Sequence, residues 1–177
     1  NSLGRFNQNG IDLDGDYRAD ALASLDASWQ QGLARLFKTA RQYWGKDKLI
    51  LINGSSLPIY QPSINGRMFE TFPAHWEDGG TWAASMEQYL NRLPAQNYQP
   101  SVYVINSNTN NTGQQNNYQK MRFGLASTLL GDGYFSFDHG DQAHEQTWWY
   151  DEYSVKLGQP NTQDRKSTRL NSSHSLP

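Results

Sequence analysis

Short apolar runs alternate with amphipathic helical patterns along most of this 177-residue chain, and this alternation restricts the fold more than any other feature. The runs are too short for helices, so they predict buried strands, whereas apolar residues recurring every three or four positions predict helices. The predicted strands are residues 10–14, 48–54, 66–71, 101–106 and 133–138, and the predicted helices are residues 26–44, 81–93 and 116–130. Because strands connected through helices run parallel, the sequence predicts an α/β fold with a parallel sheet.

Each predicted strand ends in a polar residue of a type that enzymes use for catalysis. These residues are Asp14, Asn53, Glu70, Asn106 and Asp138. In parallel α/β folds, the carboxyl ends of the strands form the edge at which ligands bind. The sequence therefore predicts a polar site shared by all five strand ends.

Two carboxylates from different strand ends suit the cleavage of a glycosidic bond. One carboxyl group protonates the leaving oxygen, while the other attacks the anomeric carbon or activates water. Asp14 follows an apolar run directly, and Glu70 has apolar neighbours such as Phe69 and Phe72, which favours the acid role for Glu70. We therefore predict Asp14 and Glu70 as the catalytic pair.

Four segments carry a resemblance to a known family. They are residues 10–16 (GIDLDGD), 49–54 (LILING), 66–72 (GRMFETF) and 123–138 (FGLASTLLGDGYFSFD). Together they resemble the second half of a TIM-barrel family of glycoside hydrolases that is distantly related to the α-galactosidase-like enzymes. The resemblance implies that residues 1–160 form about strands four to eight of a (β/α)8 TIM barrel, a partial barrel without strands one to three.

The resemblance also implies a role for each acid. In the wider group, the acid that ends strand four is the nucleophile, and the acid that ends strand six is the general acid/base. Carried over, Asp14 takes the first role and Glu70 the second. The chain departs from the pattern at Glu70, where the relatives often have Asp.

The composition is consistent with a carbohydrate substrate. Aromatic residues make up 13% of the chain and charged residues only 18%, and Asn and Gln are abundant. Aromatic faces stack on sugar rings and amides bind hydroxyls, although Trp and Tyr also fill cores and Asn also fills turns. The predicted substrate-binding residues are Asp12, Asp16, Asn53, Trp76, Asn106, Tyr134, Asp138, His139 and Trp148. The Asn- and Thr-rich segment 107–113 is either a loop at the mouth of the site or a plain linker.

Two alternatives stay open. Acids alternate from Asp12 to Asp16 and a further acid follows at Asp20, as in the calcium loops of integrin-like β-propeller repeats. That pattern would make the chain a calcium-binding repeat module, although it occurs only once and propellers need it in every blade. The other alternative is a barrel that binds carbohydrate without cleaving it.

Several classes of protein are excluded by composition. The formal net charge of −2 gives no basic footprint for nucleic acid, and no apolar run is long enough to span a membrane. The chain has no cysteine, which excludes a disulfide scaffold, a zinc–thiolate site and a cysteine nucleophile, and leaves its location open, a secreted or periplasmic one included. The histidines are not spaced as a metal site, so we expect neither a metal nor another cofactor.

Both ends of the chain have unusual features. Residues 164–174 resemble a translated sequencing-adapter oligonucleotide and show no apolar periodicity. We therefore expect residues 161–177 to be a disordered tail of artefactual origin, and exclude it from the fold. The chain begins with Asn1 and reaches a predicted strand within about ten residues. We expect it to be a fragment of a longer open reading frame.

Overall fold

The computed structural model describes residues 3–143, 145–146 and 148–158, and the chain divides into two units. The first unit, Asn1–Thr147, holds every described strand. In the second unit, Trp148–Pro177, the described part contains a short 3-10 helix, η4 (Asp151–Ser154), in which the ring of Tyr153 meets those of Trp149 and Tyr150 edge-on. Among the described residues, no helix is both long and apolar enough to cross a membrane.

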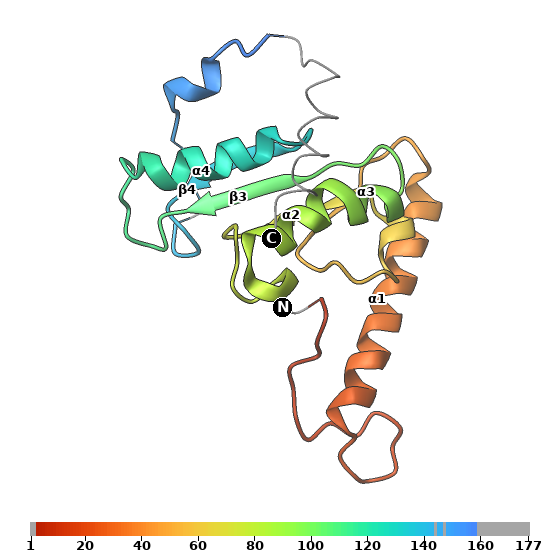
Figure 1. Cartoon of the computed structure of the whole chain (residues 1–177). Helices are drawn as coiled ribbons and strands as arrows, with labels where there is room; N and C mark the ends of the chain where they lie inside the picture. The colour runs from red at the N-terminus through yellow and green to blue at the C-terminus, as the bar shows by residue number, and fades with distance from the viewer. Residues whose placement is uncertain (1–2, 144, 147, 159–177) are drawn as a thin grey trace, which may run out of the picture. The chain divides into compact units, whose positions relative to one another are not determined.

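The first unit alternates helices and strands, as Figure 1 shows. Its elements are α1 (Leu22–Trp44), β1 (Leu51–Asn53), the 3-10 helix η1 (Gln61–Ser63), β2 (Gly66–Phe69), the 3-10 helix η2 (Asp78–Gly80), α2 (Trp82–Glu87), the π-helical turn η3 (Gln88–Arg92), α3 (Leu93–Gln96), β3 (Val104–Asn108), α4 (Tyr118–Leu129) and β4 (Tyr134–Asp138). The prediction of an α/β class with parallel strands is therefore confirmed.

The four strands form one parallel sheet in the order β1-β2-β3-β4. Asn53 pairs with Met68, Phe69 pairs with Ile105, and β3 pairs with β4 as far as Asn108 with Asp138. Consecutive strands are thus neighbours, which is the order that strands have in a barrel. The partial TIM barrel, with residues 1–160 as its second half, remains a prediction, and the predicted tail at 161–177 lies outside the described residues.

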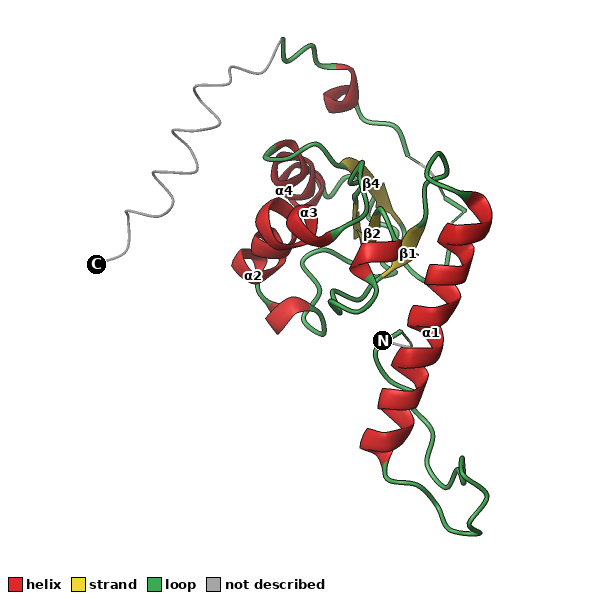
Figure 2. Cartoon of the chain, turned by 90° about the vertical axis from the view of Figure 1, so that its right-hand side faces the viewer, coloured by secondary structure: helices red, strands yellow, loops and turns green. Residues whose placement is uncertain are grey.

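Helices lie against the sheet in Figure 2, and two apolar clusters fill the helix-facing side of the sheet. Phe69 and Ile105 pack with Tyr103, which precedes β3, and with Met86, Tyr89 and Leu93 of the α2–α3 region, while Ile50 and Ile52 pack with Tyr60 and the inner face of α1. Side chains alternate along a strand, so the intervening residues face the opposite side of the sheet. On that side Leu51 is 37% exposed and Tyr134 is 67% exposed.

The helix predictions are confirmed with shifted ends. Gly45, which has a positive φ (73°), ends α1 as expected, and its N–H donates to the carbonyl of Arg41. The side chain of Thr81 accepts from the N–H of Ala84 at the start of α2, and that of Asn117 accepts from the N–H of Lys120 at the start of α4. These caps satisfy backbone donors that have no partner within the helix.

The prediction of a strand over residues 10–14 is wrong. These residues form an exposed, bent loop, and Leu13 is 58% exposed. A strand needs a neighbour for its backbone groups, and no described strand pairs with this segment. Aspartate side chains bind the backbone N–H groups instead: Asp12 accepts from Gly15 and Tyr17, and Asp20 accepts from Leu13.

Close packing between α4 and the sheet gives a first testable prediction. A Cβ at Gly124 would lie 2.5 Å from Oγ of Ser107 and 2.6 Å from the ring of Phe135. Gly124→Ala is therefore expected to lower the free energy of unfolding by about 1–3 kcal/mol, measured by urea denaturation. The control is Gly32→Ala in α1, where no described atom lies within 4 Å and stability should rise by about 0.5–1 kcal/mol. Equal effects of the two changes would contradict this packing.

Candidate active site

Four polar side chains lie in a row where the parallel strands end. Asn53 ends β1, Glu70 follows β2 and Asp138 ends β4, whereas Asn106 lies in the middle of β3, which runs on to Asn108 instead of ending at Asn106 as predicted. The residues before them, such as Ile52, Phe69 and Ile105, belong to the helix-facing clusters. The polar row therefore faces the opposite side of the sheet, at its carboxyl edge.

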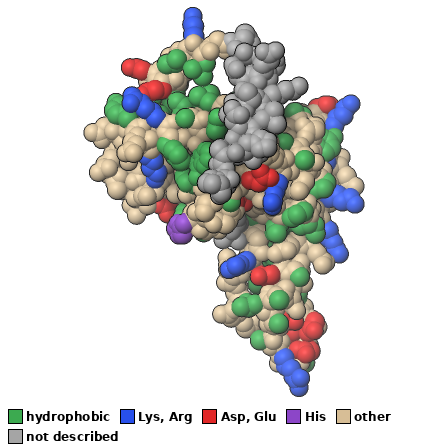
Figure 3. Space-filling view, in the orientation of Figure 1, with side chains coloured by type: hydrophobic (Ala, Val, Ile, Leu, Met, Phe, Trp, Pro, Cys, Tyr) green, Lys and Arg blue, Asp and Glu red, His purple; other side chains and the backbone are tan. Residues whose placement is uncertain are grey.

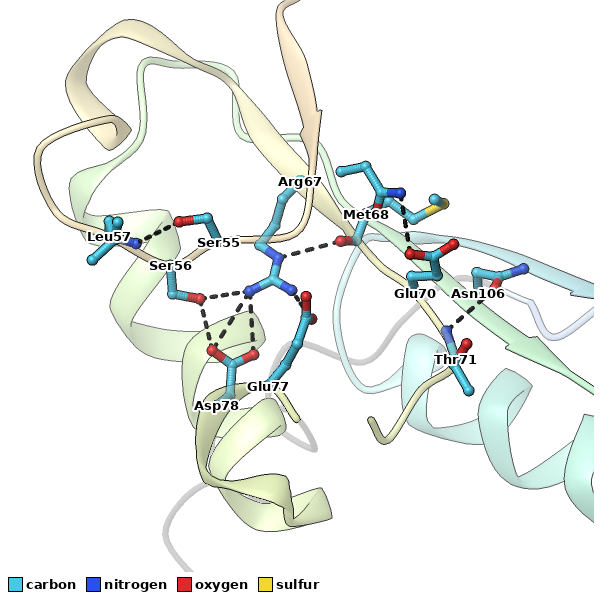
Figure 4. A network of polar contacts seen from close by, with 11 residues as sticks. Ser55, Ser56, Leu57, Arg67, Met68, Glu70, Thr71, Glu77, Asp78 and Asn106 are labelled. Atoms are coloured by element: carbon cyan, nitrogen blue, oxygen red, sulfur yellow. Dashed lines mark hydrogen bonds and ion pairs between the residues drawn. The ribbon is translucent and has the colours of Figure 1, made fainter. Parts of the chain in front are cut away.

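Hydrogen bonds fix the orientation of these side chains (Figure 4). Nδ2 of Asn53 donates to Oε2 of Glu70 over 3.2 Å. Oδ1 of Asn106 accepts from the N–H of Thr71 over 3.3 Å, and its Nδ2 donates to Oδ2 of Asp138 over 3.0 Å. Since the amide of Asn106 turns its oxygen toward β2 and its nitrogen toward β4, it connects the segment that carries Glu70 to the strand that carries Asp138.

A cavity of about 450 Å³ opens beside Glu70. Its described lining combines carboxylates, amides, a lysine and aromatic rings: Glu70, Thr71, Phe72, Pro73, Ala74, His75, Trp76, Asn108, Asn110, Asn111, Lys120, Gly140 and Asp141. Trp76 is 52% exposed, and its ring meets that of His75 edge-on, with centroids 4.5 Å apart. An exposed indole offers an apolar face, and the carboxyl group and amides beside it offer hydrogen bonds, so this lining suits a ligand such as a sugar ring that has both apolar faces and hydroxyls.

The rim of this cavity is a rigid loop after β3. Oγ1 of Thr109 donates to the carbonyl of His139 over 2.6 Å, and the N–H of Asn111 donates to the same carbonyl over 2.9 Å. Asn110 and Asn111 both have positive φ (53° and 63°), a conformation that Asn tolerates better than most residues. The loop is thereby fixed to the segment after β4, with its amides at the cavity.

The segment that carries Glu70 and Trp76 is fixed by a buried arginine (Figure 4). The side chain of Arg67 is 1% exposed, and its guanidinium forms ion pairs with Glu77 and, over 3.2 Å, with Asp78. The guanidinium also donates to Oγ of Ser56 over 2.7 Å and lies 4.3 Å from the centre of the Phe69 ring. Protein groups therefore surround it in place of water. Burial raises the pKa of Glu77, and the charge of Arg67 opposes that rise.

A second cavity, of about 420 Å³, lies on the other side of Trp76. Trp76 lines both cavities, while Arg67, Glu77 and Asp78 line only the second. The exposed indole and the arginine network therefore share the second cavity.

The other predicted site residues are dispersed. Tyr134 begins β4, at the end of the strand opposite to the polar row, and Trp148 belongs to the second unit. His139 follows β4, where its Nδ1 is buried without a hydrogen-bond partner among the described residues. Asp12, Asp14 and Asp16 lie in the exposed loop before α1, so Asp14 does not end a strand. Figures 1 and 2 show this loop beyond the start of α1, away from the sheet.

Three aspartates of the loop before α1 bring their carboxylates close together. One carboxylate oxygen from each of Asp12, Asp14 and Asp20 lies within 4.8 Å of the others. Acidic side chains gather at this end of the unit in Figure 3. Carboxylate oxygens at such separations are the ligands that Ca²⁺ prefers, so the calcium interpretation of this loop stays open.

Sequence reasoning missed several residues of the cavity. Asn108, Asn110 and Asn111 come from the segment that was consistent with either a linker or the mouth of a site. Nothing in the sequence indicates that Lys120 and Asp141 line a cavity, because single charged residues in loops and helix turns are common on surfaces. The Asn-rich run after a predicted strand was the one signal that could have located this rim.

Comparison with known proteins gives one family. The family model described as "Hypothetical glycosyl hydrolase family 15" matches residues 2–170. No curated protein and no solved structure matches the chain.

Proposed function

The chain belongs to this family of hypothetical glycosyl hydrolases, and we propose that it hydrolyses the glycosidic bonds of an oligo- or polysaccharide in the cavity beside Glu70. The observation that carries the proposal is a carboxyl group at a strand end, lining a cavity together with an exposed Trp and three amides. This combination supplies both a proton donor and a surface for sugar.

In the proposed mechanism, Glu70 protonates the oxygen of the leaving sugar. Asn53 orients the Glu70 carboxyl group by donating from Nδ2 to its Oε2 oxygen over 3.2 Å. Trp76 offers the face of its indole to a sugar ring, and Asn108 and Asn110 offer amides to its hydroxyls. Preorganised partners of this kind keep the acid in a productive orientation.

The mechanism needs a second carboxylate to attack the anomeric carbon or activate water. The family resemblance supports Asp14, although its loop lies away from the sheet. Asp138, bound to Asn106, and Asp141, in the lining of the cavity, are the acids that the structure brings to the edge occupied by Glu70. A pair about 5–5.5 Å apart would retain the anomeric configuration, and a pair about 6.5–9.5 Å apart would invert it.

The proposal is tested by incubating the protein with a broad panel of polysaccharides and measuring new reducing ends. Release from at least one glycan is expected. Binding without release would favour a barrel that binds carbohydrate but does not cleave it.

Calcium binding is a second candidate function, supported by the clustered oxygens of Asp12, Asp14 and Asp20. If the loop binds Ca²⁺, millimolar CaCl2 should raise the Tm by several degrees relative to EDTA, because a ligand bound only to the native state stabilises it. Asp14→Asn should abolish most of this shift, whereas Asp47→Asn, an exposed acid after α1, should preserve it. The same Tm in CaCl2 and EDTA would exclude this function.

A further inference from the structure

Lys120 lies in the first turn of α4 and lines the cavity that contains Glu70. Its ammonium group donates to Oδ1 of Asn110 over 3.1 Å. Two acids, Glu70 and Asp141, line the same cavity, yet Lys120 forms no ion pair within 4.0 Å in the part of the chain that the structure describes. The cavity therefore holds a lysine that has no described carboxylate within ion-pair distance.

This position is electrostatically unfavourable for a cation. The lysine is partly buried, and burial lowers its pKa. The first turn of a helix also carries the positive end of the helix dipole, which disfavours a positive side chain there. An anion in the cavity would relieve both effects.

The ammonium group also has a definite hydrogen-bond partner in the wall of the cavity. Asn110, which binds it, belongs to the rim loop, and the N–H of Asn110 donates to Oδ1 of Asn108 over 3.0 Å. Thr109 and Asn111 fix the same loop to the carbonyl of His139. A cation fixed at the wall of a cavity is preorganised for a charged group of its ligand.

We propose that the cavity binds an acidic sugar, a hexuronic acid residue whose carboxylate accepts hydrogen bonds from the Lys120 ammonium group. The inference rests on the proposed function, because it takes the cavity as the sugar site. The two acids of the lining do not oppose it equally. Glu70 carries no charge when it acts as the proton donor, so of the two only Asp141, which accepts from Nδ2 of Asn111, sets a negative charge against the positive charge of Lys120. A neutral sugar would leave the ammonium with an amide oxygen alone.

The test is a binding experiment that needs no turnover. Trimers of galacturonic, glucuronic and mannuronic acid are titrated by calorimetry into the Glu70→Gln variant, next to the same trimers with their carboxyl groups reduced to alcohols. At least one uronate should bind about tenfold or more tightly than its reduced form, and added NaCl should weaken that binding. Lys120→Met should remove this preference, Lys120→Arg should keep it, and Lys46→Met, at an exposed lysine after α1, should leave it unchanged.

Three results would overturn the inference. They are equal or weaker binding of every uronate relative to its reduced form, a preference that survives in Lys120→Met, and a uronate affinity that does not depend on salt. Circular dichroism of each variant shows that the fold is retained, and Lys120→Arg tests the charge even if Lys120→Met does not fold. Because binding is measured without cleavage, failure of the hydrolase proposal would appear separately, as missing reducing ends.

Discussion

Replacing Glu70 by Gln is expected to lower the rate of glycoside hydrolysis by about 10²- to 10⁴-fold, the range that a general acid contributes. The amide cannot deliver a proton to the leaving oxygen, but it has nearly the shape of the carboxyl group and can still meet Nδ2 of Asn53 through its oxygen. Affinity for the intact oligosaccharide should therefore change by less than about threefold, which distinguishes lost chemistry from lost binding. Reducing-end release and calorimetry measure the two effects.

The matched control is Glu87→Gln, a change of the same kind at an exposed position in α2. It should leave hydrolysis unchanged. Hydrolysis by Glu70→Gln at the wild-type rate would remove Glu70 from the mechanism. In the same assay, Asp14→Asn, Asp138→Asn and Asp141→Asn identify the second carboxylate, because loss of the nucleophile or base should cost a comparable factor.

Replacing Arg67 by Met is expected to lower the free energy of unfolding by about 3–5 kcal/mol, because it leaves two buried carboxylates without their counter-charge. The side chains of Glu77 and Asp78 are only 9% and 6% exposed, and Arg67 is the ion-pair partner that the described structure gives to each. Urea denaturation measures the loss. Adding Glu77→Gln and Asp78→Asn to the Arg67→Met variant should recover part of it, since the isolated charges are then removed.

The control is Arg92→Met, which breaks the ion pair with Glu87. That pair spans 3.6 Å and its side chains are 63% and 46% exposed, so the change should cost less than about 1 kcal/mol. Equal losses from Arg67→Met and Arg92→Met would show that the buried network does not stabilise the fold. If Arg67 also positions the segment that carries Trp76, Arg67→Lys should reduce the free energy of sugar binding more than it reduces the free energy of unfolding. Lysine keeps the charge but cannot bind Glu77 and Asp78 through two separate nitrogens, as the guanidinium does.

The regular elements could be predicted from sequence because local patterns determine them. The run at 48–54 and the stripe of α1 from Leu33 to Ala40 bury their apolar residues against each other, so periodicity identified both. Parallel pairing followed from the helical connections, and it brought Asn53, Glu70, Asn106 and Asp138 to one edge. The sequence pattern thus locates Asn53, Glu70 and Asp138 at the ends of β1, β2 and β4, whereas β3 runs two residues past Asn106.

Other features depend on contacts between residues that are distant in the sequence, and local patterns do not predict such contacts. The run at 10–14 has the alternation of a strand, but a strand also needs a paired neighbour, and the described sheet supplies none. The role of Arg67 depends on acids ten and eleven residues later that fold back onto it. Likewise, the hydrogen bond between Lys120 and Asn110 at the cavity joins α4 to a loop ten residues earlier.

The most direct test of the proposed site is a crystal structure of the Glu70→Gln variant with an intact oligosaccharide substrate. We expect one sugar ring on the exposed face of Trp76, and an interglycosidic oxygen about 2.6–3.2 Å from the amide nitrogen of residue 70. An oligosaccharide bound with no glycosidic oxygen near that residue, or bound outside this cavity, would contradict the assignment of the cavity as the site of cleavage.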